Sequence, residues 1–327
     1  MSAYYLQAVR GHLEIVERAQ PLDTLLADAR TPADLRPRLE TAGRIREFAS
    51  RELKLPDNGS YRSYADLGRA YAVWNVVAAP EFSLEPVQSC FPVAGCVSYR
   101  GFYAREDAER HAARLRAAGH DVFVAGVPAY STLGWFDDPL LSTFIRYPES
   151  ELARLVFHEL AHQALYVKGD TSFNESFAVA VEREGVRRWL QARGNAAEVA
   201  AFAAAQARVG EFAALMAGAR RRLQALYAED LPVQERRARK AAAFRALQAD
   251  YAALKRDRWH GYAGYDRYFS GEGPNNALMA SFATYTRHVD AFARLLAAEG
   301  GDLARFYARA AEIAALEKPA RDAALGR

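Results

Sequence analysis

Two histidines four residues apart, with a glutamate directly after the first, are the residues of this chain best suited to chemistry. The segment reads His158-Glu159-Leu160-Ala161-His162. Positions i and i+4 of an α-helix project from one face, so both imidazoles can bind one Zn²⁺. Glu159 is then placed to act on a water at that metal. The alternative is a pair of core histidines that hydrogen-bond to backbone or water.

The flanking residues predict a helix that buries this face. Leucine and valine recur at helical spacing from Leu152 to Leu165, Ser150 is a candidate N-cap, and Gly169 ends the pattern. This stripe also carries both histidines, so we expect them to point inward. A metal is the simplest partner for a buried pair of imidazoles.

A catalytic zinc site needs a third protein ligand, and Glu175 is the best candidate. It lies on a second predicted helix, which begins with an N-cap at Thr171 or Ser172 and shares its face with small and apolar residues. The alternative is a capping box between Ser172 and Glu175. Asp170 is the reserve ligand.

The spacing of these residues resembles that of the gluzincin metallopeptidases, with twelve residues between His162 and Glu175. More narrowly, HELAHQALYVKGDTSFNESFA resembles the signature of a bacterial family of putative zinc aminopeptidases, which are often lipoproteins. The likeness covers most of the chain, since it extends to YYLQAVRGH, CFPVAGCVSYRGFY, AYSTLGWFDDPLL and GPNNALMASFATY. It implies a zincin-like fold and a zinc-dependent aminopeptidase.

The chain departs from the thermolysin-type pattern in its outer ligand shell. One helical turn beyond the glutamate ligand, that pattern has an aspartate that orients a histidine, whereas this chain has Val179. A carboxylate from elsewhere must therefore orient the histidine, and Asp170 and Glu182 are the candidates.

The predicted mechanism is amide hydrolysis with Glu159 as general base. Tyr285 and Tyr130 are the predicted donors to the oxyanion. An aminopeptidase also needs an acidic anchor for the substrate α-ammonium, and the sequence does not select among Asp137, Asp138 and Glu149. The alternatives are an endopeptidase of the cell envelope and a non-catalytic, zinc-stabilised binding or assembly protein.

Composition excludes some partners. Lys and Arg number 43 against 40 Asp and Glu, a net charge of +3 that does not indicate a nucleic-acid binder. No apolar run approaches the roughly 18–20 residues of a membrane span. The resemblance implies a periplasmic or envelope-anchored lipoprotein, with its lipid anchor outside this sequence. The expected partner is a peptide substrate, and no oligomeric state is indicated.

The pattern of elements predicts a predominantly α-helical α+β fold. We expect N-terminal helices in residues 1–60, a catalytic core with a small sheet in 61–193, a long helical hairpin in 194–256, and an aromatic loop with C-terminal helices in 257–327, all in one compact unit.

Two shorter segments have open interpretations. Residues 131–135 are a candidate edge strand for a substrate backbone, or else a packed loop. Cys90 and Cys96 are the only cysteines, and they form either a disulfide across a turn or two buried thiols.

Overall fold

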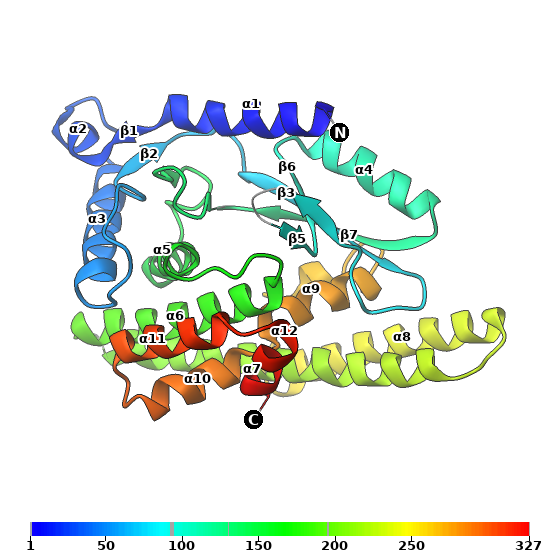
Figure 1. Ribbon diagram of the computed structural model, residues 1–327. Coiled ribbons are helices and arrows are strands. Elements are labelled where there is room, and N and C mark those ends of the chain that lie inside the picture. The colour runs from blue at the N-terminus through cyan, green and yellow to red at the C-terminus, as the bar shows by residue number, and fades with distance from the viewer. Residues whose placement is uncertain (1, 92–94, 130, 195, 327) are drawn as a thin grey trace.

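The computed structural model describes residues 2–91, 95–129, 131–194 and 196–326, without the side chains of residues 2, 3, 5, 6, 8 and 284–286. Helices dominate, and the strands are short (Figure 1). The prediction of a predominantly α-helical α+β fold is confirmed.

The helices are α1 (Ser2–Arg18), α2 (Leu22–Ala27), α3 (Arg36–Arg51), α4 (Arg105–Ala117), α5 (Glu149–Ala164), α6 (Thr171–Ala192), α7 (Ala196–Ala228), α8 (Val233–Asp257), α9 (Asn276–Thr286), α10 (Val289–Ala298), α11 (Leu303–Ala314) and α12 (Lys318–Leu325), with a 3-10 turn at Asp266–Tyr268. The strands are β1 (Gln20–Pro21), β2 (Ser63–Ala65), β3 (Val73–Pro80), β4 (Ser89–Phe91), β5 (Gly95–Val97), β6 (Arg100–Phe102), β7 (His120–Val127) and β8 (Leu140–Leu141).

The larger sheet has β3 at its centre, with β6 and β7 both antiparallel to it. Helix α4 leads from β6 across the sheet to β7, which is the crossover that the sequence predicts. Val76, Phe102 and Val122 form its core together with Ala108 and Ala112 of α4. These apolar side chains hold the helix against one face of the sheet.

The second sheet brings two distant segments together beside α5. Strand β2 pairs with β1 on one side and, in parallel, with β8 on the other, where Tyr64 lies opposite Leu140. The residues that precede β2 therefore lie beside those that precede β8. The backbone N–H of Tyr61 donates to the carbonyl of Asp138 at 2.6 Å.

Helix α5 runs through the middle of the molecule, between α3 and α6 (Figure 1). Helices α5 and α6 approach closely at Gly185, because a Cβ there would lie 2.7 Å from Cδ2 of Phe157 and 2.8 Å from Cδ1 of Leu53. Side chains of α6 can therefore reach the histidines of α5.

Helices α7 and α8 form the predicted hairpin, which projects from the rest of the molecule (Figure 1). The aromatic residues that follow α8 pack on it, with Tyr265 stacked on Phe212 and Phe269 on Tyr251, each at 4.0 Å between ring centroids. By length and composition alone, α7 is apolar enough to cross a membrane, although charged residues such as Arg208 and Glu211 interrupt its apolar sequence.

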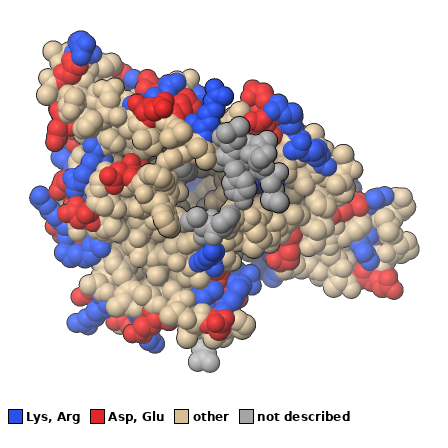
Figure 2. All heavy atoms as spheres, turned by 45° about the horizontal axis from the view of Figure 1, so that its top comes forward, with Lys and Arg blue, Asp and Glu red and all other residues tan. Residues whose placement is uncertain are grey.

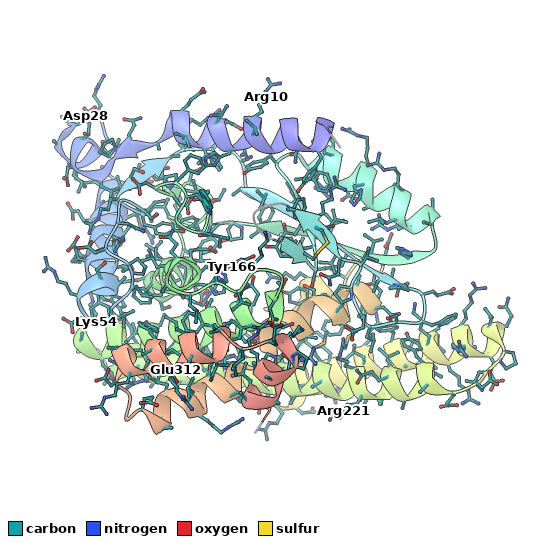
Figure 3. All side chains as sticks on the ribbon, viewed as in Figure 1. Arg10, Asp28, Lys54, Tyr166, Arg221 and Glu312 are labelled. Atoms are coloured by element: carbon teal, nitrogen blue, oxygen red, sulfur yellow. A yellow bond between two sulfur atoms is a disulfide. The ribbon has the colours of Figure 1, made fainter. Side chains whose placement is uncertain are left out.

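Three predictions about local structure need correction or completion. Residues 131–135 form turns instead of an edge strand, and Trp135 N–H donates to the carbonyl of Thr132 at 3.2 Å. The predicted C-terminal helices of residues 257–327 are interrupted at His288, between α9 and α10, where the N–H of His288 donates to Ser176 Oγ at 3.1 Å. Cys90 and Cys96 form a disulfide between β4 and β5, which is the yellow bond in Figure 3.

Candidate metal centre

Three side chains from α5 and α6 converge on one point. Nε2 of His158 lies 3.1 Å from Nε2 of His162 and 3.3 Å from Oε2 of Glu175, which in turn lies 3.7 Å from Nε2 of His162. All three residues are buried or nearly so, and together they could hold a metal ion. The structure therefore brings together the three side chains that the sequence predicts as metal ligands.

A carboxylate on α6 orients the first histidine. Nδ1 of His158 lies 2.8 Å from Oε2 of Glu182. An ionised carboxylate can only accept a hydrogen bond, so Nδ1 is the donor. Nδ1 then carries the hydrogen, and Nε2 of the neutral ring presents its lone pair toward His162 and Glu175. Glu182 is held by Arg154 at 3.3 Å, and Arg154 also pairs with Glu151 at 2.8 Å.

The polar atoms of this site fit a cation. Oε2 of Glu175, one of the three converging atoms, is buried without a hydrogen-bond partner among the described residues. Three glutamates of the site are less than a tenth exposed, namely Glu159, Glu175 and Glu182. Arg154 pairs with Glu182 but also with a fourth carboxylate, that of Glu151. Burying so many carboxylates is costly unless positive charge offsets them, and a divalent ion among the three converging atoms would do so.

The pKa values of His158 and Glu175 also indicate that the site favours a positive charge. Burial works against protonation of His158, but the carboxylates of Glu175 and Glu182 outweigh it and raise the pKa of His158 to about 10. Burial likewise works against ionisation of Glu175, but His162 and His158 outweigh it and lower the pKa of Glu175 to about 2. Both shifts favour a positive charge among the carboxylates of this site.

The start of α6 sets the position of Glu175. Asp170 is the N-cap, since its carboxylate accepts the N–H of Phe173 at 3.2 Å. Asn174 pins the preceding loop by accepting the N–H of Val167 at 2.7 Å and donating to its carbonyl at 2.9 Å. The predicted caps at Thr171 or Ser172 are therefore wrong by one or two residues. The alternative of a capping box with Glu175 is also wrong, because Glu175 points at the histidines.

Asp170 also has no role as the reserve ligand or as the carboxylate that orients a histidine. Its Oδ2 lies 2.9 Å from Arg321 and 3.3 Å from Lys318, both on α12. Glu182, two turns beyond Glu175, takes the place of the aspartate that the thermolysin-type pattern has one turn beyond its ligand.

Tyrosines other than the predicted ones couple to the centre. Burial raises the pKa of Tyr99, and the charge of Glu175 adds to the effect. Burial and the charge of Glu175 also raise the pKa of Tyr166, which Figure 3 shows in the middle of the molecule beyond α5. Of the predicted donors, Tyr130 and the side chain of Tyr285 lie outside the described residues. The sequence has no local signal for Tyr99, because only the tertiary fold brings it within reach of the charge of Glu175.

The three candidate anchors for an ammonium group lie in different environments. Asp138 is 3% exposed, whereas Asp137 is exposed. Glu149 is at the start of α5, where it accepts from Trp189 Nε1 at 3.0 Å and pairs with Arg193 at 3.4 Å. Glu149 is thus already neutralised, at the far end of the helix from His162.

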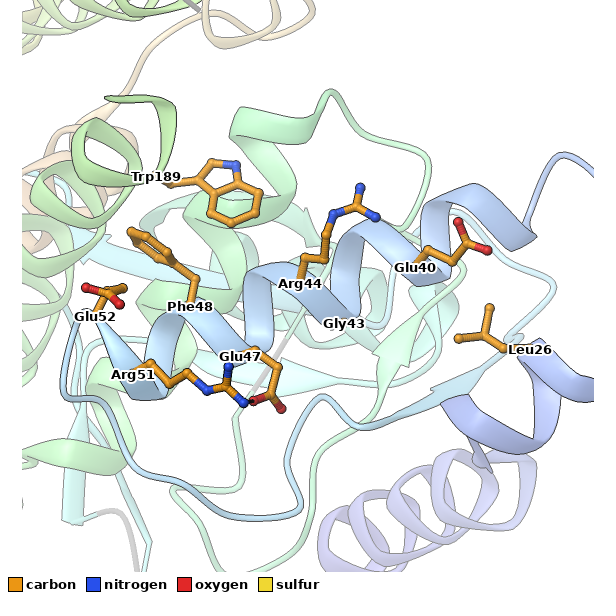
Figure 4. Close-up of a pocket in the computed structure, with 9 residues that line it drawn as sticks. All are labelled: Leu26, Glu40, Gly43, Arg44, Glu47, Phe48, Arg51, Glu52 and Trp189. Carbon is orange, nitrogen blue, oxygen red and sulfur yellow. Dashed lines mark ion pairs between the residues drawn. The ribbon is translucent and has the colours of Figure 1, made fainter. Parts of the chain in front are cut away.

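Two hollows on the surface lie away from the metal ligands. One of about 670 Å³ follows the outer side of α3 and reaches Trp189 (Figure 4). The other, of about 340 Å³, lies at the start of α6 beside Cys96 and Lys318. On the face in Figure 2, acidic and basic side chains are interspersed, as expected for a chain with nearly balanced charge.

The comparison with protein families covers nearly the whole chain. The family model described as "Putative aminopeptidase" matches residues 3–325. Neither a curated protein nor a solved structure matches the chain. Since the family model spans both helices of the metal centre and every other described helix, the chain belongs to the putative aminopeptidase family.

Proposed function

We propose that this protein is a zinc-dependent aminopeptidase that hydrolyses the first peptide bond of its substrate. The observation that carries the proposal is the convergence of His158, His162 and Glu175 within 4.8 Å of one another, with Glu159 beside them on α5. Two imidazoles and a carboxylate are the donor set of a catalytic zinc site with an open fourth position. Family membership supports a peptidase and a peptide substrate.

In this proposal His158, His162 and Glu175 hold the zinc ion, and Glu182 fixes the tautomer of His158. When bound, zinc supplies Lewis-acid polarisation of the substrate carbonyl and lowers the pKa of a water molecule. Glu159 takes a proton from the attacking water and passes it to the leaving amine. Burial raises the pKa of Glu159, which brings its carboxylate closer to the range in which it can both accept and return a proton.

We assign Tyr99 as the donor to the carbonyl oxygen of the scissile bond. Its raised pKa keeps the phenol neutral, and a neutral hydroxyl is the form that donates. The charges of Glu175 and Glu159 both add to the rise in the pKa of Tyr99, so its hydroxyl lies within electrostatic reach of the two carboxylates. Tyr166 is the second candidate, since its coupling is to Glu175.

Replacing Glu159 by Gln tests this mechanism. The amide has nearly the same shape but cannot act as a base, so we expect kcat to fall by about 10²–10⁴-fold with zinc still bound. The measurements are hydrolysis of a peptide library and zinc content of the purified variant. Glu151→Gln is the matched control, because it removes a carboxylate from the same helix at a position 47% exposed. Near-normal turnover in Glu159→Gln would contradict the role of Glu159.

Two alternatives give different results in the same assays. An endopeptidase cleaves peptides whose N-terminus is acetylated, whereas an aminopeptidase rejects them. In a zinc-stabilised binding protein, Glu159→Gln leaves function intact and removal of zinc lowers thermal stability.

A further inference from the structure

Asp138 is a buried carboxylate beside Gln163, which lies one helical turn beyond Glu159 on α5. Its Oδ2 accepts the N–H of Thr132 at 2.9 Å and lies 3.4 Å from Nε2 of Gln163. Gln163 follows Glu159 by four residues on α5, so the two side chains share one face of that helix. The pKa of Asp138 rises to about 6, chiefly through burial and further through the charge of Glu159.

A rigid framework holds this carboxylate in place. Arg46 is 1% exposed, and its guanidinium donates to the carbonyls of Ser60 at 2.7 Å and Asn58 at 2.9 Å. Asn58 in turn donates to Oε1 of Gln163 at 2.8 Å. The backbone N–H of Asp138 donates to Oγ of Ser60 at 3.2 Å. Two loops and a helix thus fix both Asp138 and the amide beside it.

No cation neutralises Asp138 among the residues that the structure describes. The guanidinium of Arg46 is occupied by carbonyls and by the side chain of Ser50. The hydrogen bonds described for the carboxylate all reach Oδ2, and none reaches Oδ1. An ionised carboxylate that is 3% exposed and lacks a counterion is costly, so its retention points to a positively charged ligand.

The surroundings favour an ammonium group over a metal ion. Three donors already surround Oδ2, namely the N–H of Thr132, the hydroxyl of Ser131 and the amide of Gln163, so Oδ1 is the oxygen left for a charged donor. A divalent ion also needs several anionic or carbonyl ligands, whereas one carboxylate oxygen suffices for an ammonium.

We propose that Asp138 binds the α-ammonium group of the substrate peptide and thereby restricts hydrolysis to peptides with a free N-terminus. The inference rests on the proposed function and selects one of the three acidic candidates. Asp137 is solvent-exposed, and Glu149 is paired with Arg193. Asp138 lies beside Gln163 on the face of α5 that carries Glu159, so the anchor and the general base are on the same side of this helix.

Kinetics on Asp138→Asn test the proposal. The substrates are dipeptides with Ala, Leu, Phe or Arg in the first position, each with a free and an acetylated N-terminus. We expect kcat/KM for free peptides to fall by about 30-fold or more, mainly through KM, because the ammonium loses a buried partner. Zinc content stays at the wild-type value. Asp137→Asn and Glu149→Gln are matched controls, expected to stay within about twofold of wild type.

A binding measurement separates this inference from the proposed function, because it needs no turnover. Calorimetric titration of the zinc-loaded wild-type protein with L-leucinol and L-phenylalaninol is compared with their N-acetyl derivatives. We expect the free amines to bind at least about 30-fold more tightly, and Asp138→Asn to remove the difference. If wild type hydrolyses no peptide but shows this pattern, the proposed catalysis fails and the anchor stands.

Two outcomes would overturn the anchor. One is an active Asp138→Asn variant that keeps the wild-type preference for free over acetylated peptides. The other applies even if that variant does not fold. Wild type would then be titrated with 4-methylpentan-1-ol, which is leucinol without its amine, and binding as tight as that of leucinol would contradict the proposal.

Discussion

Glu182 offers a test of the metal site through a residue that does not touch the metal. Replacing it by Gln keeps the size of the side chain but removes the charge that holds the Nδ1 proton of His158 at 2.8 Å. It also leaves Arg154 with only Glu151, whose side chain is 47% exposed. Losing such a partner lowers metal affinity or activity by about 10–100-fold, or about 1.4–2.7 kcal/mol.

The loss of zinc affinity should be smaller for residues that are further from His158 in this series of charged contacts. Glu182 contacts the ligand His158, Arg154 contacts Glu182, and Glu151 contacts only Arg154. We therefore expect a large loss for Glu182→Gln and a loss of about twofold or less for Glu151→Gln.

The assay is competition for zinc with a chromogenic chelator, with circular dichroism as the check on folding. Glu184→Gln is a further control, since Glu184 lies on the same helix but pairs with Arg187 and Arg188 at 2.6 Å. A zinc affinity for Glu182→Gln within about twofold of wild type would refute the orienting role of Glu182.

Two further substitutions test other parts of the account. Tyr99→Phe should lower kcat by about 10²–10³-fold with little change in KM or zinc content, and an unchanged kcat alongside a strong loss in Tyr166→Phe would move the donor to Tyr166. Asp170→Asn should lower the free energy of unfolding by about 3–5 kcal/mol, because it leaves the buried Arg321 unpaired. Phe173 N–H and Arg321 outweigh burial and hold the pKa of Asp170 below its usual 3.8. The stability from Asp170 is therefore full above about pH 4 and lost as the pH falls further, so a urea titration of wild type should show an acid-dependent loss that the variant lacks.

The parts of the site that were predicted from the sequence are those that local spacing determines. Helical periodicity puts His158 and His162 on one face, and the loop to the next helix is short enough to return Glu175 to them. Glu182 was one of two candidates, and the sequence could not exclude Asp170. That choice depends on Arg321, which lies far along the chain and pairs with Asp170.

The parts that were missed depend on contacts between distant segments. The parallel pairing of β2 with β8 brings Ser60 to Asp138, and such pairing leaves no local signal in three-residue and two-residue strands. No glycine or proline beside His288 signals the break between α9 and α10 in the sequence. The break is stabilised instead by a hydrogen bond to Ser176 on another helix. Residues 131–135 form turns instead of the candidate edge strand, since Ser131 and Thr132 accept local backbone N–H groups.

The central claim is that His158, His162 and Glu175 bind one zinc ion. Elemental analysis of wild type and Glu175→Ala, both purified without added metal, tests it most directly. The account predicts one zinc per chain in wild type and loss of zinc in the variant, with both proteins folded. A wild type that binds no zinc even after reconstitution, or a variant that keeps its zinc, would contradict it.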